Sequence, residues 1–436
     1  MDKKDVFSKI SHLLKEYYAK QEEEFIPGKT LVRYAGSVYG GDEVIAMLES
    51  IMSGWLGLGK EGEAFEKEFA SFVGVKHSLL TNSGSSANLL GITALTSWKF
   101  PERLKEGDEV IVAASGFPST INPIIQNRLS PVFIDVDSET YNLRPEDLDK
   151  AHSKKSRLIV VCHNFGNPNE MDVVMDFAKR NNLFVFEDNC DALGSVYDGK
   201  KTGSFGIMAS ESFYPAHHIT TGGEGGAVLI NDDFRLYRIA QSFRDWGRAC
   251  WCGASGGPKD GVCGFRFKFQ VDGFPYDHKY IFDHIGYNLK PVEAQAAMGR
   301  IQLKRFPLFI EKRKENFNTY QKFFKKYEKF FILPKALPKS DPCWFAYLLT
   351  LKDDAPFDRL AITNFLEEHN IQTRPSFSGN ILRQPAYKHV NYRVVGSLEN
   401  SDRIFERTFF IGIYPGLTNR HLDYVMSIFD KFLSKY

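Results

Sequence analysis

Short apolar runs that alternate with helical segments constrain the fold of this chain more than any other feature of its sequence. The strand-like runs lie at residues 78–80, 110–113, 132–136, 158–161 and 183–186. Helical segments separate them, for example residues 171–179. Because parallel strands need crossover connections, this alternation predicts an α/β fold whose mostly parallel sheet is covered by helices.

The character of the sequence changes on both sides of this region. Apolar residues at helical spacing between residues 6 and 17 predict an amphipathic N-terminal arm. After about residue 332, a strand-like run at 345–351 and a helical run at 360–369 predict a smaller α+β module. A chain of 436 residues also exceeds the usual size of one core. We therefore expect a helical arm at 1–60, a large domain at 61–310 and a small C-terminal domain at 311–436.

The balance of charge narrows the classes of partner. The chain carries 55 basic and 54 acidic side chains, and its formal net charge is +1. This balance gives no reason to expect nucleic acid or an anionic membrane surface as a partner. We find no apolar signal-type region at the N-terminus and no run long and apolar enough to span a bilayer. We expect a cytoplasmic protein whose partners are small molecules or other proteins.

Polar and aromatic residues follow several of the predicted strands, at the sheet edge where ligands bind in open α/β folds. The turn at 81–88 reads TNSGSSAN and precedes a helix, so its small residues and hydroxyls favour a phosphate. Such a turn is common by itself. Phe117 follows the run at 110–113, and Asp188 follows the run at 183–186. Asp188 is well placed to meet a ligand cation, although it could instead cap the next helix.

Two adjacent histidines, His217 and His218, precede a glycine-rich turn. The ordinary pKa of imidazole, about 6.5, suits a general base at neutral pH. Paired histidines in a loop are more often structural, so the surrounding motif has to decide between the two interpretations. That motif, residues 212–226, reads SFYPAHHITTGGEGG.

The cysteines suggest a metal site. Three of the six, Cys250, Cys252 and Cys263, lie in one glycine- and proline-rich segment at 250–263. Clustered thiols in a reducing compartment are typical of zinc or iron–sulfur ligation. Cys190 is the natural fourth ligand because it follows the same strand end as Asp188, whereas Cys162 and Cys343 are expected to be small core residues.

Over nearly the whole chain these motifs resemble the fold-type-I sugar aminotransferases that use pyridoxal phosphate. Residues 212–226 resemble their cofactor-lysine segment, with His217 in place of the lysine. The cysteine set and the missing lysine together resemble one branch of the group, the iron–sulfur 3-dehydrases of 3,6-dideoxysugar synthesis for lipopolysaccharide O-antigen. Residues 378–380 and 411–418 also look like this group.

The resemblance implies a lyase that removes the C3 hydroxyl of a nucleotide-linked 4-keto-6-deoxyhexose, with CDP-4-keto-6-deoxy-D-glucose as the expected substrate. It implies pyridoxamine 5′-phosphate, derived from pyridoxal phosphate, and a [2Fe–2S] cluster as cofactors. The cluster would pass single electrons from an NADH-dependent flavin/iron–sulfur reductase, because the chain has no nicotinamide fingerprint of its own. The enzyme would be a homodimer.

The resemblance also assigns roles to matching residues. His217 would remove a proton from the imine of the cofactor and the sugar, and Asp188 would pair with the pyridinium nitrogen under a ring stacked on Phe117. Ser85, Ser86 and Ser212 would contact the cofactor phosphate, and Asn288 of a neighbouring subunit would contact the same phosphate. The ligands of the cluster would be Cys190, Cys250, Cys252 and Cys263.

Two other hypotheses remain open. In the first, the enzyme is still a dehydratase, but its cysteines bind zinc or have no shared role. It would then resemble the cluster-free GDP-4-keto-6-deoxymannose 3-dehydratases, in which glutamate regenerates the cofactor. The other treats the missing lysine as loss of activity and the chain as a sensing or scaffold protein. Iron content separates the first hypothesis from the iron–sulfur one, whereas Asp188, Phe117 and the phosphate serines argue against the second.

Overall fold

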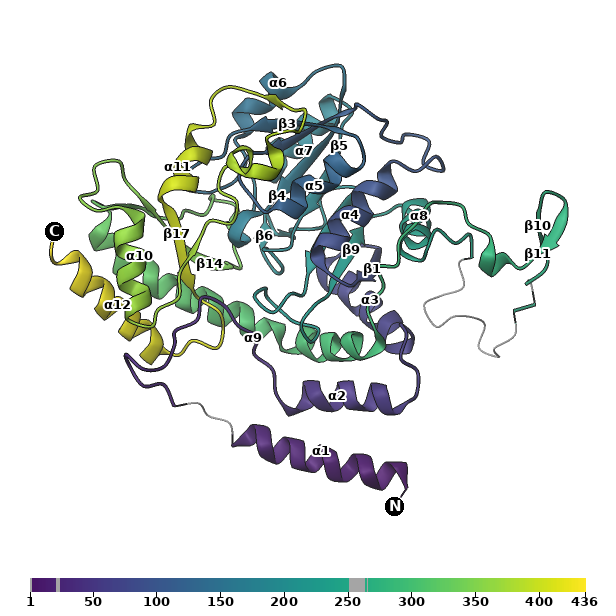
Figure 1. Ribbon diagram of the computed structural model, residues 1–436, viewed down its shortest axis with the longest axis horizontal. Helices are drawn as coiled ribbons and strands as arrows, with labels where there is room; N and C mark the ends of the chain where they lie inside the picture. The colour runs from purple at the N-terminus through teal and green to yellow at the C-terminus, as the bar shows by residue number, and fades with distance from the viewer. Residues whose placement is uncertain (1, 21–23, 251–262, 265) are drawn as a thin grey trace.

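An eight-stranded sheet forms the centre of the computed structural model, which describes residues 2–20, 24–250, 263–264 and 266–436 (Figure 1). Its strand order is β1-β9-β8-β5-β4-β2-β3-β16. The strands are β1 (His77–Thr81), β2 (Glu109–Ala113), β3 (Ser130–Ile134), β4 (Ser156–Cys162), β5 (Phe184–Asp188), β8 (Met208–Ser212), β9 (Gly226–Ile230) and β16 (Arg393–Val394). Only β9 runs against its neighbours, β1 and β8. The predicted mostly parallel sheet is confirmed.

Successive side chains along a strand point to opposite faces of the sheet, and both faces are buried under helices. Val110 and Val112 of β2 join the core under α4 (Gly84–Leu95), α5 (Pro118–Gln126) and α8 (Phe234–Arg244). Ile111 and Ala113 join a second core with α7 (Met171–Arg180).

The sequence did not predict β8, which reads MASES. All five residues are buried, but three are polar. Ser210 contacts Asp188 on one face, and Glu211 accepts a hydrogen bond from Asn189 on the other. Because polar partners take up both faces, β8 needs no apolar run.

The small domain is built on a four-stranded antiparallel sheet in the order β12-β14-β17-β15. Its elements are β12 (Phe331–Ile332), β14 (Ala346–Leu351), β15 (Arg374–Pro375), β17 (Thr408–Gly412), α10 (Arg359–Glu368), α11 (Glu399–Arg407) and α12 (Asn419–Leu433). The 32-residue helix α9 (Glu293–Phe324) runs from beneath the large sheet to this domain (Figure 1). The expected boundary at 310–311 lies inside α9, and the division into three parts stays a prediction.

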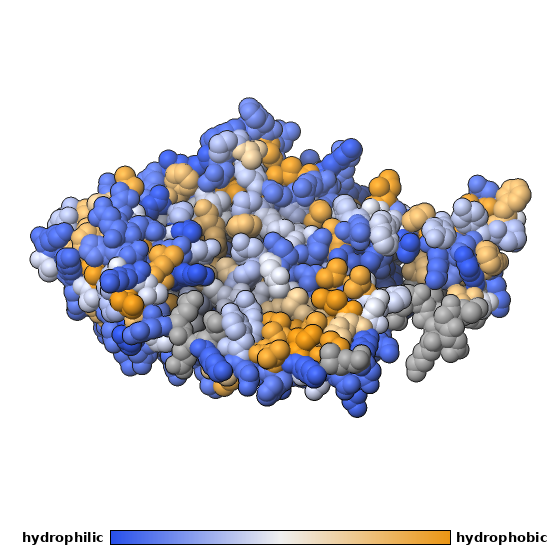
Figure 2. Space-filling model, turned by 60° about the horizontal axis from the view of Figure 1, so that its bottom comes forward, coloured by the Kyte–Doolittle hydropathy of each residue, from blue (hydrophilic) through white to orange (hydrophobic). Residues whose placement is uncertain are grey.

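Two peripheral regions complete the fold. A hairpin of β10 (Phe269–Val271) and β11 (Phe274–Tyr276) projects from the body (Figure 1). At the N-terminus, α1 (Lys3–Ala19) lies beside α2 (Gly41–Met52) and buries none of its residues. Figure 2 shows apolar side chains gathered on the face that carries these two helices. Leu13 of α1 and Ile51 of α2 are exposed.

The remaining helices are α3 (Lys60–Val73) and α6 (Leu148–Ala151). The short strands β6 (Val196–Tyr197), β7 (Lys200–Lys201) and β13 (Ser340–Asp341) form a separate three-stranded sheet in the order β13-β6-β7. None of the helices in the described ranges is long and apolar enough to cross a membrane.

Candidate active site

A cavity of about 460 Å³ opens where the large sheet meets the small domain. The strands β4, β5 and β8 end at its floor, and residues of the small domain form the opposite wall. Its lining includes six residues that the sequence singled out as site residues, namely Ser85, Phe117, Asp188, Cys190, Ser212 and His217. The cavity therefore brings together segments that lie more than 130 residues apart in the chain.

Asp188 ends β5 and is 3% exposed. Thr120 Oγ1 donates to its Oδ2 at 2.6 Å, and Asn88 Nδ2 donates to the same oxygen at 2.9 Å. Ser210 Oγ and the amide of Cys190 donate to Oδ1 at 3.3 and 3.2 Å. These four donors hold the carboxylate at the cavity floor, where it can accept a hydrogen bond from a cationic ring nitrogen. It does not cap a helix, because a turn rather than a helix follows β5.

The turn after β1 forms the N-terminus of α4. Ser83 is the N-cap residue, and its Oγ accepts a hydrogen bond from the amide of Ser86 at 3.1 Å. A Cβ at Gly84 would lie 2.5 Å from Ser212 Cβ, so only glycine fits between the helix start and β8. The helix dipole, free amides and the hydroxyls of Ser85 and Ser212 make this cradle suitable for a phosphate.

His217 lies in the same cavity with its side chain 17% exposed. Its Nε2 is 3.4 Å from Asp191 Oδ1, and its Nδ1 is buried with no hydrogen-bond partner in the described part of the chain. Burial lowers the pKa of His217 to about 4, a shift that the negative charge of Asp188 reduces and the positive charge of Arg313 increases. The imidazole is therefore neutral at pH 7 and able to accept a proton.

Asp191 is a site residue that the sequence analysis missed. Burial, together with the charge of Asp188, raises its pKa to about 7. It lies three residues after Asp188 on the turn that follows β5, and that spacing was the available signal. Asn88, Thr120 and Ser210 were also missed, because their roles depend on contacts with Asp188 from three separate elements.

Aromatic rings form the upper part of the cavity. Phe117 is 50% exposed and lies edge-on to Phe377 of the small domain, with ring centroids 5.7 Å apart. Such an exposed ring at a strand end is available for stacking. Arg374 also lines the cavity, with its guanidinium 4.4 Å from the ring centroid of Tyr34.

Two residues with expected phosphate contacts are not among those that line the cavity, and both contacts stay predictions. Ser86 does not line the cavity, and its hydroxyl is 3.0 Å from Ser83 Oγ beneath the cradle. Asn288 pairs with Asp245 in an isolated β-bridge and does not line this chain's cavity. Its expected action from a neighbouring subunit stays a prediction.

The cysteines are only partly brought into one place. Cys190 lines the cavity, and so does Cys162, which the sequence placed in the core. Cys343 is buried, as expected. Cys263 Sγ lies 3.2 Å from His278 Nε2, whereas Cys252 and most of the segment 250–263 lie outside the described residues. Among the residues that are described, no group of three or more His, Cys, Asp or Glu side chains could hold a metal ion.

Comparisons with known proteins agree with this architecture. Residues 39–430 match the model of the DegT/DnrJ/EryC1/StrS aminotransferase family. The lipopolysaccharide biosynthesis protein RfbH of Salmonella typhimurium is 48% identical over 428 residues, which cover 97% of each chain. The dTDP-4-dehydro-2,6-dideoxy-D-glucose 3-dehydratase of Saccharopolyspora spinosa is 44% identical over 99% of this chain and 93% of its own.

A solved structure shares the fold. The E. coli GDP-4-keto-6-deoxy-D-mannose 3-dehydratase with bound hydrated pyridoxal phosphate superimposes with a TM-score of 0.82 at 28% identity. The match covers 91% of this chain and 98% of that one. The predicted fold-type-I architecture is confirmed.

Proposed function

We propose that this chain, which belongs to the DegT/DnrJ/EryC1/StrS aminotransferase family, is a nucleotide-sugar 3-dehydratase of deoxysugar biosynthesis. One observation carries the proposal. His217 lies in the cavity, and no lysine is among the described residues that line it. An aminotransferase needs a lysine amine there to hold its cofactor as a Schiff base, which an imidazole cannot form, although an imidazole can still accept and donate protons. The names of the 3-dehydratase relatives support the same reaction.

The residues of the cavity fit pyridoxamine 5′-phosphate. The cradle of Gly84, Ser85 and Ser212 would hold the phosphate, Asp188 would accept a hydrogen bond from the ring nitrogen, and Phe117 would stack on the ring. When bound, this cofactor supplies an amine that can link to a sugar ketone and a ring that accepts electrons. Ser86 would support the cradle from beneath.

His217 would act as the proton acceptor. Its Nε2 is the nitrogen that lies near Asp191, and burial keeps the ring neutral at pH 7. Proton removal by this nitrogen would drive departure of the C3 hydroxyl from the sugar. The same residue could return a proton to the leaving oxygen, because an imidazole that has accepted a proton becomes a general acid.

The finer proposal concerns the substrate and the electrons. We propose CDP-4-keto-6-deoxy-D-glucose as the substrate, a 3,6-dideoxysugar precursor of lipopolysaccharide as the product, and Cys190, Cys250, Cys252 and Cys263 as the ligands of a [2Fe–2S] cluster. A separate NADH-dependent reductase would supply the electrons, and two copies of the chain would form the active unit. The pattern of cysteines supports the cluster, and the similarity to the Salmonella lipopolysaccharide protein supports the pathway.

A second candidate is a cluster-free 3-dehydratase that uses glutamate to regenerate its cofactor. A Yersinia pseudotuberculosis relative, 33% identical over 87% of this chain, carries the name GDP-4-keto-6-deoxy-D-mannose 3-dehydratase.

One experiment tests the reaction and separates the candidates. Protein purified without oxygen and loaded with pyridoxamine 5′-phosphate is incubated with CDP-4-keto-6-deoxy-D-glucose, and loss of water from the sugar is followed by mass spectrometry. We expect dehydration by the parent and none by His217→Asn. Iron, acid-labile sulfide and visible absorption are expected in the parent.

The opposite results are equally clear. An amino sugar formed from glutamate would contradict the dehydratase. Dehydration without iron, sustained by glutamate, would contradict the cluster and establish the second candidate.

A further inference from the structure

A fully buried arginine lies behind the proposed base. Arg313 is on α9, and its side chain is 0% exposed. Among the described residues no carboxylate lies within ion-pair distance of its guanidinium, and its Nε has no hydrogen-bond partner. A buried cation without a paired anion is costly, so such a residue calls for a functional explanation.

The guanidinium binds three backbone carbonyls. Nη2 donates to the carbonyl of His217 at 2.9 Å, and Nη1 donates to those of Phe345 at 3.0 Å and Trp344 at 3.3 Å. The neighbouring His218 adds a fourth link, since its Nε2 lies 2.8 Å from the carbonyl of Cys343. The loop of His217 is thereby tied to the segment that enters β14 of the small domain.

The surroundings of the His217 imidazole include residues of the segments that these hydrogen bonds join. The ring of Phe345 lies edge-on to the ring of His217, with centroids 5.5 Å apart. The titratable and charged groups that face His217 come from three parts of the chain. They are Asp188 at the end of β5 with Asp191 in the turn after it, Tyr214 and His218 in the loop of His217 itself, and Arg313 on α9. Arg313 is the cation of this set, and it opposes the two acidic groups.

We propose that Arg313 is a positioning residue for His217: it fixes the peptide of the base against the small domain and places beside the imidazole a positive charge that favours the neutral, proton-accepting form. This inference rests on the proposed function of His217. The lowered pKa of His217, to which Arg313 contributes, agrees with it.

Two substitutions separate charge from hydrogen bonding. Arg313→Gln removes the charge, while Arg313→Lys keeps it and loses the planar donor fork. The pH dependence of dehydration is measured for both after thermal melting and the cofactor spectrum have shown that they fold and bind. Because a nearby cation lowers the pKa of an imidazole, its loss should move the acid limb of the rate profile of the Gln variant up by about one pH unit. The Lys variant should keep the acid limb and lose kcat.

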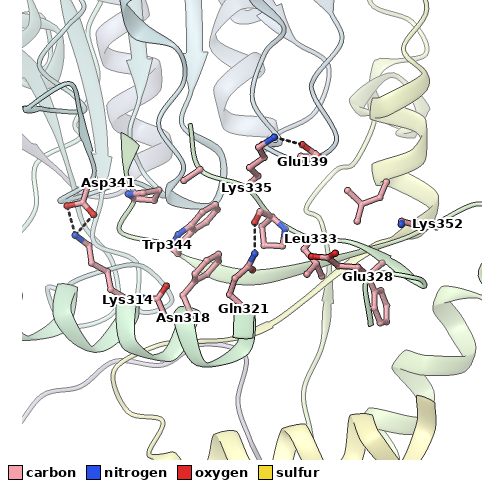
Figure 3. A pocket seen from close by; sticks show the side chains of 16 residues that line it. Glu139, Lys314, Asn318, Gln321, Glu328, Leu333, Lys335, Asp341, Trp344 and Lys352 are labelled. Carbon is pink, nitrogen blue, oxygen red and sulfur yellow. Dashed lines mark hydrogen bonds and ion pairs between the residues drawn. The ribbon is translucent and has the colours of Figure 1, made fainter. Parts of the chain in front are cut away.

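Lys314 offers a matched control. It follows Arg313 on α9, but its Nζ lies 2.6 Å from Asp341 in a separate cavity (Figure 3). Lys314→Gln removes the same charge from the same turn and should leave the acid limb unmoved.

The outcomes discriminate clearly. Equal losses of rate in both Arg313 variants with an unmoved acid limb would show a merely structural arginine. If neither variant folds, nuclear magnetic resonance titration of the parent decides, with His217→Asn to assign the signal: the proposal requires a neutral His217 at pH 6, and a protonated ring overturns it. Dehydration that survives in His217→Asn would instead contradict the function of His217 itself.

Discussion

At the scale of single residues, the chemistry of the cavity depends on which side chain occupies position 217. Asp188, Phe117 and the phosphate cradle suit a pyridine cofactor whether or not an amine is present to bind it. The imidazole of His217 lies within reach of the same space but cannot form the covalent link. In the proposed function, this one side chain would separate amine transfer from dehydration.

Substitution of His217 by lysine should reverse that choice. We expect His217→Lys to bind pyridoxal phosphate covalently and to lose dehydration, because an anchoring amine replaces the base. Borohydride reduction followed by mass spectrometry should then find the cofactor attached to the variant and not to the parent. Dehydration at the parental rate in this variant would remove His217 from the mechanism.

At the scale of elements, one side chain of α9 completes the start of another helix. The N-cap residue of α3, Gly59, has no side chain to cap the helix. Glu293 instead accepts hydrogen bonds from the amides of Gly59, Glu61 and Gly62, the last two at 2.7 and 3.3 Å. Because Glu293 is 4% exposed, these charge-assisted bonds are shielded from water. The long helix is therefore linked to the region before β1.

Loss of this carboxylate should weaken the fold. We expect Glu293→Ala to lower the free energy of unfolding by about 2 kcal/mol, since amides at a helix start lose their acceptor. Urea denaturation followed by circular dichroism measures the change. Glu315→Ala on the same helix removes an exposed carboxylate and should change the free energy of unfolding by less than about 0.5 kcal/mol. Equal effects of the two substitutions would contradict the capping role.

At the scale of the whole molecule, two features suggest that one chain does not complete the site. Apolar side chains gather on the face that carries α1 and α2 (Figure 2), and Leu13 of α1 and Ile51 of α2 are exposed. A second copy of the chain would cover such a surface in a symmetric dimer. Asn288, expected at the cofactor phosphate, does not line the cavity of its own chain. The proposed homodimer accounts for both features.

Complementation between variants tests this arrangement. Neither His217→Asn nor Asn288→Ala dimers should dehydrate the sugar at the parental rate. After unfolding and refolding together, mixed dimers would contain one site with both native residues, so about a quarter of all sites should recover. Recovery is measured as dehydration rate per chain. No recovery in dimers shown to be mixed would place Asn288 outside the partner's site.

Local patterns in the sequence were sufficient to predict most of the scaffold. The apolar runs indicated β1 to β5 because each is buried on both faces, and the glycine and serine turn indicated the start of α4. The strands and the turn depend on hydrophobicity and backbone conformation, which are properties of a few adjacent residues. His217 was placed in the cavity by the resemblance of residues 212–226 to a cofactor-lysine segment.

Only the tertiary structure decided which side chains act on those residues. The strand β8 escaped prediction because polar neighbours from other segments bury it. Thr120, Asn88 and Ser210 converge on Asp188 from three elements, and Arg313 reaches His217 across 96 residues of sequence. Local sequence patterns do not record such partners, because hydrogen bonding and electrostatic shifts of pKa depend on distance in space and on burial rather than on separation along the chain.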